Sequence, residues 1–157
     1  MTTAEKIKPE IFKANDIRGK YPSEINEKII SEIARRLALY FDSKFSARGG
    51  SAAGGQIPSS KLKIVVAHDI RPSSPSLYKA VLGQLKAQNS KLKAIKVGLA
   101  TTPMFYFLVK KLKAGGGLMI TASHNPKDYN GLKIVDKNAL PISGLGIRKL
   151  FKPKDIF

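Results

Sequence analysis

The chain has 157 residues and a formal net charge of +17, from 28 Lys and Arg against 11 Asp and Glu. This length fits one domain that can bury its own core, and the lack of Cys excludes a disulfide scaffold, a cysteine-bearing zinc site and a thiol nucleophile. The excess of cations favours anionic partners, but only six of the 28 are Arg and the lysines are scattered, which argues against nucleic-acid recognition.

The first third of the chain predicts one strand and one helix. Residues 12–19 (FKANDIRG) are expected to form a strand that runs into a turn. Ser23 is the expected cap of a helix over about residues 24–41, because large apolar side chains recur there every four residues. Residues 46–60 (SARGGSAAGGQIPSS) are rich in Gly, Ser and Ala, which predicts a flexible insertion without chemistry.

Apolar strands then alternate with amphipathic helices. Strands are expected at residues 62–67, 92–99 and 117–121, and helices at residues 75–88 and 103–113, each with a proline at its start. Such alternation indicates βαβ units with helices on both faces of a sheet. The sequence therefore predicts an α/β fold, a three-layer α/β/α domain with a mixed, mainly parallel sheet.

The last part of the chain completes this domain. Residues 131–136 (GLKIVD) predict a strand antiparallel to the one at 117–121, and Ser143 is expected to cap a short helix that ends near Leu150. We expect the domain to cover residues 1–151 and residues 152–157 to begin a linker.

The loops at the carboxyl ends of parallel strands are where ligands bind in such sheets. One of them contains Ser123, which directly follows a strand in a stretch of turn-forming residues (TASHNP, residues 121–126). Successive backbone N–H groups in such a loop can surround a phosphate. A serine there can carry a phosphoryl group, whose negative charge requires cations such as His124 and Lys133.

Four blocks of sequence together carry a resemblance to a known family. They are NDIRG (residues 15–19), AHDIRPSS (67–74), VGLATTPMFYF (97–107) and TASHNPKDYNGLK (121–133). In this order they resemble the first domain of the α-D-phosphohexomutases, the phosphomannomutase/phosphoglucomutase family. The resemblance covers nearly the whole chain.

The resemblance implies an isomerase that interconverts hexose 1-phosphate and hexose 6-phosphate, of mannose or glucose, through a bisphosphorylated sugar. Ser123 would carry the phosphoryl group and would be a ligand of Mg²⁺ through its phosphate. Lys133 would assist proton transfer and bind phosphate, His124 would contact the sugar, and Arg18 would neutralise the phosphoserine. These four residues are the predicted catalytic set.

Two further residues are assigned to substrate and phosphate binding by the same resemblance, Asn125 and Arg71. Asp69, two residues before Arg71, is expected to help order the site together with it. The expected partners are a hexose phosphate and a hexose bisphosphate.

The chain also departs from the family's pattern. No two aspartates lie closer than Asp128 and Asp136, so the family's Asp-rich metal loop is missing, and its sugar-recognition and distal-phosphate loops are missing too. Asn15 stands where the family usually has an aromatic residue. We therefore expect the remaining mutase domains to act in cis or in trans, with Mg²⁺ held in the complete enzyme, and the isolated chain to show little or no turnover.

Other interpretations of the same residues remain open. A non-catalytic basic module that binds a phosphorylated ligand or nucleic acid is the main alternative. A hydrolase nucleophile is disfavoured because Ser123 lacks the flanking glycines of a nucleophile elbow and no downstream His can act as base. A zinc pair of His68 and His124 is disfavoured because the two residues lie 56 positions apart with no carboxylate spacing around them. The longest apolar run has only strand length and the N-terminus has no apolar leader, so we expect a cytoplasmic protein without a membrane span.

Overall fold

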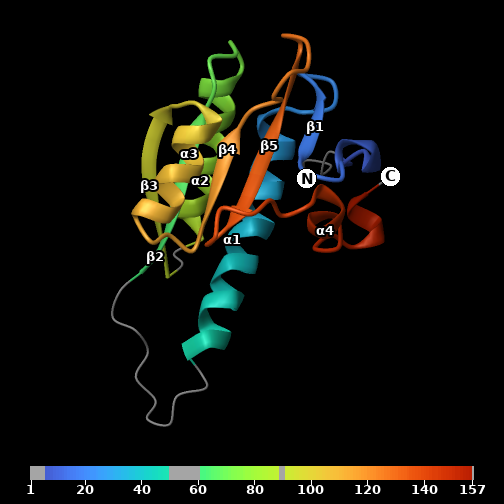
Figure 1. The fold of residues 1–157 in the computed structure, drawn as a ribbon. Coiled ribbons are helices and arrows are strands. Elements are labelled where there is room, and N and C mark those ends of the chain that lie inside the picture. The colour runs from blue at the N-terminus through green and yellow to red at the C-terminus, as the bar shows by residue number, and fades with distance from the viewer. Residues whose placement is uncertain (1–5, 50–60, 89–90, 157) are drawn as a thin grey trace.

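The computed structural model describes residues 6–49, 61–88 and 91–156 (Figure 1). The chain alternates strands and helices and has a 3-10 turn near each end. Its elements, in order, are η1 (Pro9–Ile11), β1 (Ile17–Lys20), α1 (Glu27–Gly49), β2 (Leu62–His68), α2 (Ser74–Ala87), β3 (Leu92–Leu99), α3 (Thr102–Lys111), β4 (Gly116–Ile120), β5 (Tyr129–Asp136), α4 (Gly144–Arg148) and η2 (Pro153–Asp155).

The strands form one mixed sheet in the order β1-β5-β4-β2-β3. The pairs β2/β3 and β2/β4 are parallel, while β4/β5 and β1/β5 are antiparallel. It follows that β1 to β4 all point the same way and β5 alone points back. The sheet is mixed and mainly parallel, as the sequence predicted.

Helices cover both faces of the sheet, which gives the three predicted layers (Figure 1). Ile64 and Val66 of β2 pack in the core shared with α1 and α2, whereas Val65 and Ala67 pack with Phe105 of α3 on the other face. Because β2 is buried on both sides, it reads as a continuous apolar run rather than an alternating one. None of the described helices combines the length and the hydropathy of a transmembrane segment.

The first helix differs from the sequence prediction at both ends. It begins at Glu27, and the cap is Asn26 rather than Ser23, since Asn26 Oδ1 accepts a hydrogen bond of 3.0 Å from the Ile29 N–H. The backbone of residues 20–25 instead turns, with Glu24 N and Ile25 N bonded to the Lys20 carbonyl. The helix also continues to Gly49, so the start of the predicted insertion 46–60 is helical, and residues 50–60 lie outside the described residues.

The predicted strand over residues 12–19 is shorter than expected. Strand β1 begins at Ile17, while Phe12 forms only an isolated bridge with Ile17. Lys13 N bonds to the Asp16 carbonyl, so the residues between turn tightly. Consequently Asp16 and Arg18 lie at a turn and in a short strand beside β5.

The end of the chain packs onto the domain. Ser143 caps α4 as predicted, its Oγ accepting a hydrogen bond from Gly146 N at 3.0 Å. Asp155 of η2 pairs with Arg36 of α1 at 3.0 Å, and Ile156 bridges to Ile7. The role of residues 152–157 as a linker stays a prediction, but residues 152–156 are attached to the fold.

Candidate active site at the carboxyl edge of the sheet

The connections that follow β2, β3 and β4 meet at the carboxyl edge of the parallel strands, where they border an open cleft of about 1200 Å³. In Figure 1 the connection into α2 and the connection from β4 to β5 extend from the same end of the sheet. Five of the predicted site residues line this cleft: Arg71, Ser123, His124, Asn125 and Lys133. Residues more than fifty positions apart in sequence are thus brought to one place.

Ser123 stands at the tip of the connection between β4 and β5. Its φ of 53° lies in the left-handed region, which is sparsely populated by residues other than glycine. Two hydrogen bonds hold this turn: Ser123 N donates to Thr121 Oγ1 at 3.0 Å and Asn125 N to the Ala122 carbonyl at 3.1 Å. The Ser123 side chain is exposed, and no hydrogen bond ties its hydroxyl to any described residue. The hydroxyl is therefore available to react.

The Arg71 guanidinium binds the backbone of residues 121–130, which we call the serine loop. It donates to the carbonyl oxygens of Ser123 (2.9 Å), Asn125 (2.7 Å), Pro126 (2.5 Å) and Tyr129 (3.0 Å). Its Nε donates to Asp69 Oδ2 at 3.2 Å. All five N–H donors of a guanidinium are thereby used. This geometry favours the ordering role predicted for Arg71 over the phosphate contact, because no donor is left for a ligand.

Three cationic or basic side chains face the cleft without an ion pair among the described residues. His124 and Lys127 are exposed on the serine loop, and Lys133 is half-buried on β5. No role was predicted for Lys127 from the sequence, although it follows Pro126 within the same motif. Thr101, the N-cap of α3, also lines the cleft, so the positive end of that helix dipole adds to the field there.

Arg18 is placed differently from the other predicted residues. It is not among the described residues that line the cleft, and its Nε donates to Asp16 Oδ1 at 2.7 Å. In the β1/β5 register Arg18 lies opposite Gly131, so its side chain leaves the same face of the sheet as that of Lys133. A Cβ on Gly131 would collide with the Ile17 carbonyl oxygen, which shows how closely β1 approaches β5. Arg18 is thus a neighbour of the cleft, and its charge is partly balanced by Asp16.

The described residues do not make a magnesium site by themselves. No group of three or more His, Asp or Glu side chains that could hold a metal occurs among them. Asp69 is the carboxylate at the cleft, but Oδ1 accepts hydrogen bonds from Arg71 N and Ser74 Oγ, and Oδ2 accepts from Arg71 Nε. A divalent cation prefers several free oxygen ligands. Among the described residues that line the cleft, neither carboxylate oxygen of Asp69 is free of hydrogen bonds.

The other histidine considered for metal binding is also engaged. His68 Nδ1 lies 2.8 Å from the Asp69 carbonyl oxygen, and its ring packs against Tyr78 at 4.9 Å between centroids. Burial raises the pKa of the Tyr78 hydroxyl, which accepts a hydrogen bond from Gly98 N. His68 therefore packs against α2 at the end of β2.

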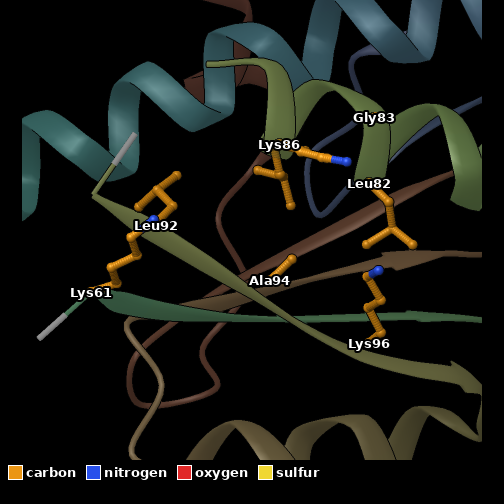
Figure 2. Close-up of a pocket in the computed structure, with 8 residues that line it drawn as sticks. Lys61, Leu82, Gly83, Lys86, Leu92, Ala94 and Lys96 are labelled. Atoms are coloured by element: carbon orange, nitrogen blue, oxygen red, sulfur yellow. The ribbon is translucent and has the colours of Figure 1, made fainter. Parts of the chain in front are cut away.

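A second hollow is a groove of about 360 Å³ between α2 and β3 (Figure 2). Its floor is apolar, formed by Leu82, Leu85, Leu92 and Ala94. Lys61, Lys86 and Lys96 stand around it, as Figure 2 shows. We call it the lysine groove. It lies beside the edge strand of the sheet and contains none of the predicted site residues.

Comparisons with known proteins agree with this picture. A family model described as phosphoglucomutase/phosphomannomutase, alpha/beta/alpha domain I, matches residues 9–152. Phosphohexose mutases of Xanthomonas campestris pv. campestris are 42% identical over 132 residues, 84% of this chain and 25% of theirs. A phosphomannomutase of Klebsiella pneumoniae is 39% identical over 140 residues, 88% of this chain and 76% of its own length.

A solved structure gives the same result for the fold. A phosphoglucomutase/phosphomannomutase family protein from Burkholderia thailandensis superposes with a TM-score of 0.69 and 32% identity, over 92% of this chain and 29% of that one. The chain thus spans about a quarter of the length of the first curated relatives that it matches.

Proposed function

Because the chain belongs to the phosphoglucomutase/phosphomannomutase family and matches its alpha/beta/alpha domain I, we propose that it carries the phosphoryl group of a hexose phosphate mutase on Ser123. The relatives are named as phosphohexose mutases and phosphomannomutases, which are isomerases. In this proposal the chain supplies one of several domains, since it spans about a quarter of those relatives. The remaining domains are provided in cis or in trans.

The observation that carries the proposal is the setting of one hydroxyl. Ser123 is exposed at the tip of a rigidly bonded turn, its hydroxyl has no partner among the described residues, and it borders the cleft that Lys127 and Lys133 also line. A phosphoserine carries about −1.5 to −2 charges at neutral pH. Two lysines and the end of a helix dipole at one cleft supply the compensation that such a group requires.

The transfer itself is a simple exchange of bonds. Ser123 Oγ forms a bond to phosphorus while the bond between phosphorus and a sugar oxygen of the hexose bisphosphate breaks. We assign to Lys133 the passage of the serine proton to the departing sugar oxygen. In the reverse exchange the phosphoserine gives its phosphoryl group to the free hydroxyl of a hexose monophosphate that carries its phosphate at the opposite position, which forms the bisphosphate again and regenerates the free serine. A covalent carrier divides a difficult transfer between two sugar positions into two similar steps.

The other cleft residues have supporting roles in this proposal. His124 and Asn125, on the serine loop, bind hydroxyl groups of the hexose. Arg18 adds positive charge from the neighbouring strand, at the reduced strength that its pairing with Asp16 allows. When bound, Mg²⁺ would neutralise the phosphoserine, with carboxylates from outside the described residues as its other ligands. We therefore expect the 157-residue protein alone to show no steady conversion of mannose or glucose 1-phosphate, which a coupled assay measures.

Phosphorylation by a sugar bisphosphate tests the proposal. The protein is incubated with glucose 1,6-bisphosphate and Mg²⁺, and phosphopeptides are identified by mass spectrometry. We expect one phosphoryl group on Ser123 and none in Ser123→Ala.

Ser43→Ala is the matched control, because Ser43 is an exposed serine on α1 whose hydroxyl bonds only to its own helix, at the Tyr40 carbonyl. This variant should be phosphorylated at the wild-type rate. Modification of other serines at the same rate, or no phosphorylation of any variant, would contradict the proposal.

A further inference from the structure

We propose that Arg71 is a positioning residue, which gives the Ser123 loop its reactive shape before any ligand binds. This inference rests on the proposed function of Ser123. In this role Arg71 binds the backbone of the loop and does not contact the substrate. The contacts around its guanidinium support this role.

Arg71 ties together two loops that are distant in sequence. Its four carbonyl partners belong to residues 52 to 58 positions later in the chain, and they span the whole turn from Ser123 to Tyr129. A guanidinium presents five N–H groups in one plane, so it can bind several carbonyls at once in fixed directions. A lysine has three donors on a flexible stem and cannot reproduce this arrangement. The loop geometry therefore depends on arginine specifically.

Arg71 is itself held in place by a polar network. Asp69 accepts from the Arg71 backbone N–H at 3.1 Å and from its Nε at 3.2 Å. Ser74 Oγ, fully buried, donates to Asp69 at 2.5 Å and accepts from Asn130 Nδ2 at 3.0 Å. Asn130 is also fully buried and its Oδ1 accepts from Gly131 N at 2.8 Å. The network runs from the end of β2 to the start of β5, so Arg71 is tied to the strand at which the serine loop ends.

The carbonyl groups that bind Arg71 fix the direction of the N–H groups in the serine loop. In a trans peptide the N–H points away from the preceding C=O. With the carbonyls of Ser123 and Pro126 directed at Arg71, the N–H groups of His124 and Lys127 point away from it. Neither of these two N–H groups has an acceptor among the residues that the structure describes. Both are unpaired donors of the serine loop, whose left-handed backbone at Ser123 is held by the hydrogen bond from Arg71 to the Ser123 carbonyl.

The charge of Arg71 supports the same conclusion. The guanidinium and the Asp69 carboxylate form an ion pair, and the Arg71 side chain is only 11% exposed. The pair adds little net charge to the cleft. Replacing Arg71 should therefore disturb the order of the loop rather than remove a phosphate contact.

Amide hydrogen exchange of the protein without ligand separates these two roles. In Arg71→Lys we expect exchange in residues 121–130 to rise roughly tenfold or more, because several hydrogen bonds that close the loop are lost. Exchange in α1 and β2 should stay at the wild-type rate. Asp69→Asn, which frees Arg71 from its support, should raise exchange in the same segment by a smaller factor. Arg148→Lys, the same change at an exposed arginine of α4, should have no effect.

A second measurement adds the chemical step. With saturating glucose 1,6-bisphosphate and Mg²⁺, Arg71→Lys should phosphorylate Ser123 roughly tenfold or more slowly than the wild type, because small displacements of a nucleophile cost large factors in rate. Slower phosphorylation with an unchanged loop would overturn the inference in favour of a phosphate contact. Faster exchange throughout the protein would overturn it in favour of a general folding role. Failure of the wild type to be phosphorylated would refute the function of Ser123, while the exchange data would still decide the role of Arg71.

Discussion

The cleft at Ser123 and the lysine groove between α2 and β3 are both basic hollows, yet they are built in different ways. Around the groove, three lysines stand over a floor of apolar side chains. At the cleft, a serine loop is held by one arginine through four backbone carbonyls. Positive charge alone is common on this surface. A fixed loop with free donors and a free hydroxyl distinguishes the cleft.

The largest expected effect compares one lysine from each hollow. Lys133→Met should slow phosphorylation of Ser123 by roughly a hundredfold, since a proton-transfer and charge-stabilising group at the cleft is lost. Lys96→Met, which removes a groove lysine in the same way, should leave the rate unchanged. The rates are measured as phosphoserine formed per unit time from glucose 1,6-bisphosphate. Equal losses in both variants would mean that overall surface charge, and not the cleft, drives the reaction.

One glycine near the cleft and one at the lysine groove allow the two regions to be compared by the free energy of unfolding. Gly131→Ala should lower the free energy of unfolding by about 2–4 kcal/mol, because the added methyl group collides with the β1 backbone at Ile17. Gly83→Ala, on α2 at the lysine groove, should raise it by about 0.5–1 kcal/mol, since the new Cβ meets no atom within 4 Å and alanine is the better helix former. Urea denaturation measures both. A stable Gly131→Ala would show that β1 can move away from β5.

Lowering the pH should destabilise the carboxyl edge of the sheet, and it should not affect the lysine groove. Glu27 accepts hydrogen bonds from Ser76 Oγ at 2.6 Å and Tyr21 Oη at 2.9 Å, and the Ser76 bond above all lowers the pKa of Glu27. Tyr21 N in turn donates to the Asp128 carbonyl of the serine loop. A lowered pKa in the folded state means that this stabilisation is present above the ordinary value of 4.5 and is lost as the pH falls through the folded value.

Urea denaturation at neutral pH and at pH values below 4.5 measures this effect. We expect the wild type to lose up to about 1 kcal/mol more than Glu27→Gln over this range, the size typical of an accessible carboxylate. The groove contributes nothing to this loss, because residues 70–127 contain no Asp or Glu. Identical acid sensitivity of the two proteins would contradict the prediction.

The smallest effect is expected at the groove itself. Replacing Lys86 and Lys96 with Met should not change the affinity for glucose 1,6-bisphosphate and should only slightly weaken contact with DNA. A basic module that binds nucleic acid predicts the opposite: affinity for DNA that falls steeply and linearly with the logarithm of salt concentration, and that drops when these lysines are removed. A salt titration of wild type and double variant measures both slopes.

Sequence patterns predicted the regular parts of the fold well, and their failures have local causes. The expected strand at residues 92–99 agrees with β3, and Ser143 caps α4 as expected. The predicted cap of α1 was wrong because both Ser23 and Asn26 are good capping residues. The Lys20 carbonyl accepts hydrogen bonds from Glu24 N and Ile25 N, and this turn leaves Asn26 as the cap. The extension of α1 to Gly49 was missed because glycine and serine beyond residue 45 suggested a flexible segment.

The sequence by itself determined the order of the elements, the alternation that makes a mainly parallel sheet, and the serine loop as the place to look for chemistry. These follow from periodicity and from short motifs, which are local properties. The tertiary structure alone determined that Arg71 donates to four loop carbonyls and to Asp69, that Lys127 lines the cleft and that Arg18 lies beside it. These features depend on contacts between groups that are far apart in the sequence. A hydrogen bond between residues more than fifty positions apart produces no local sequence pattern from which it could be predicted.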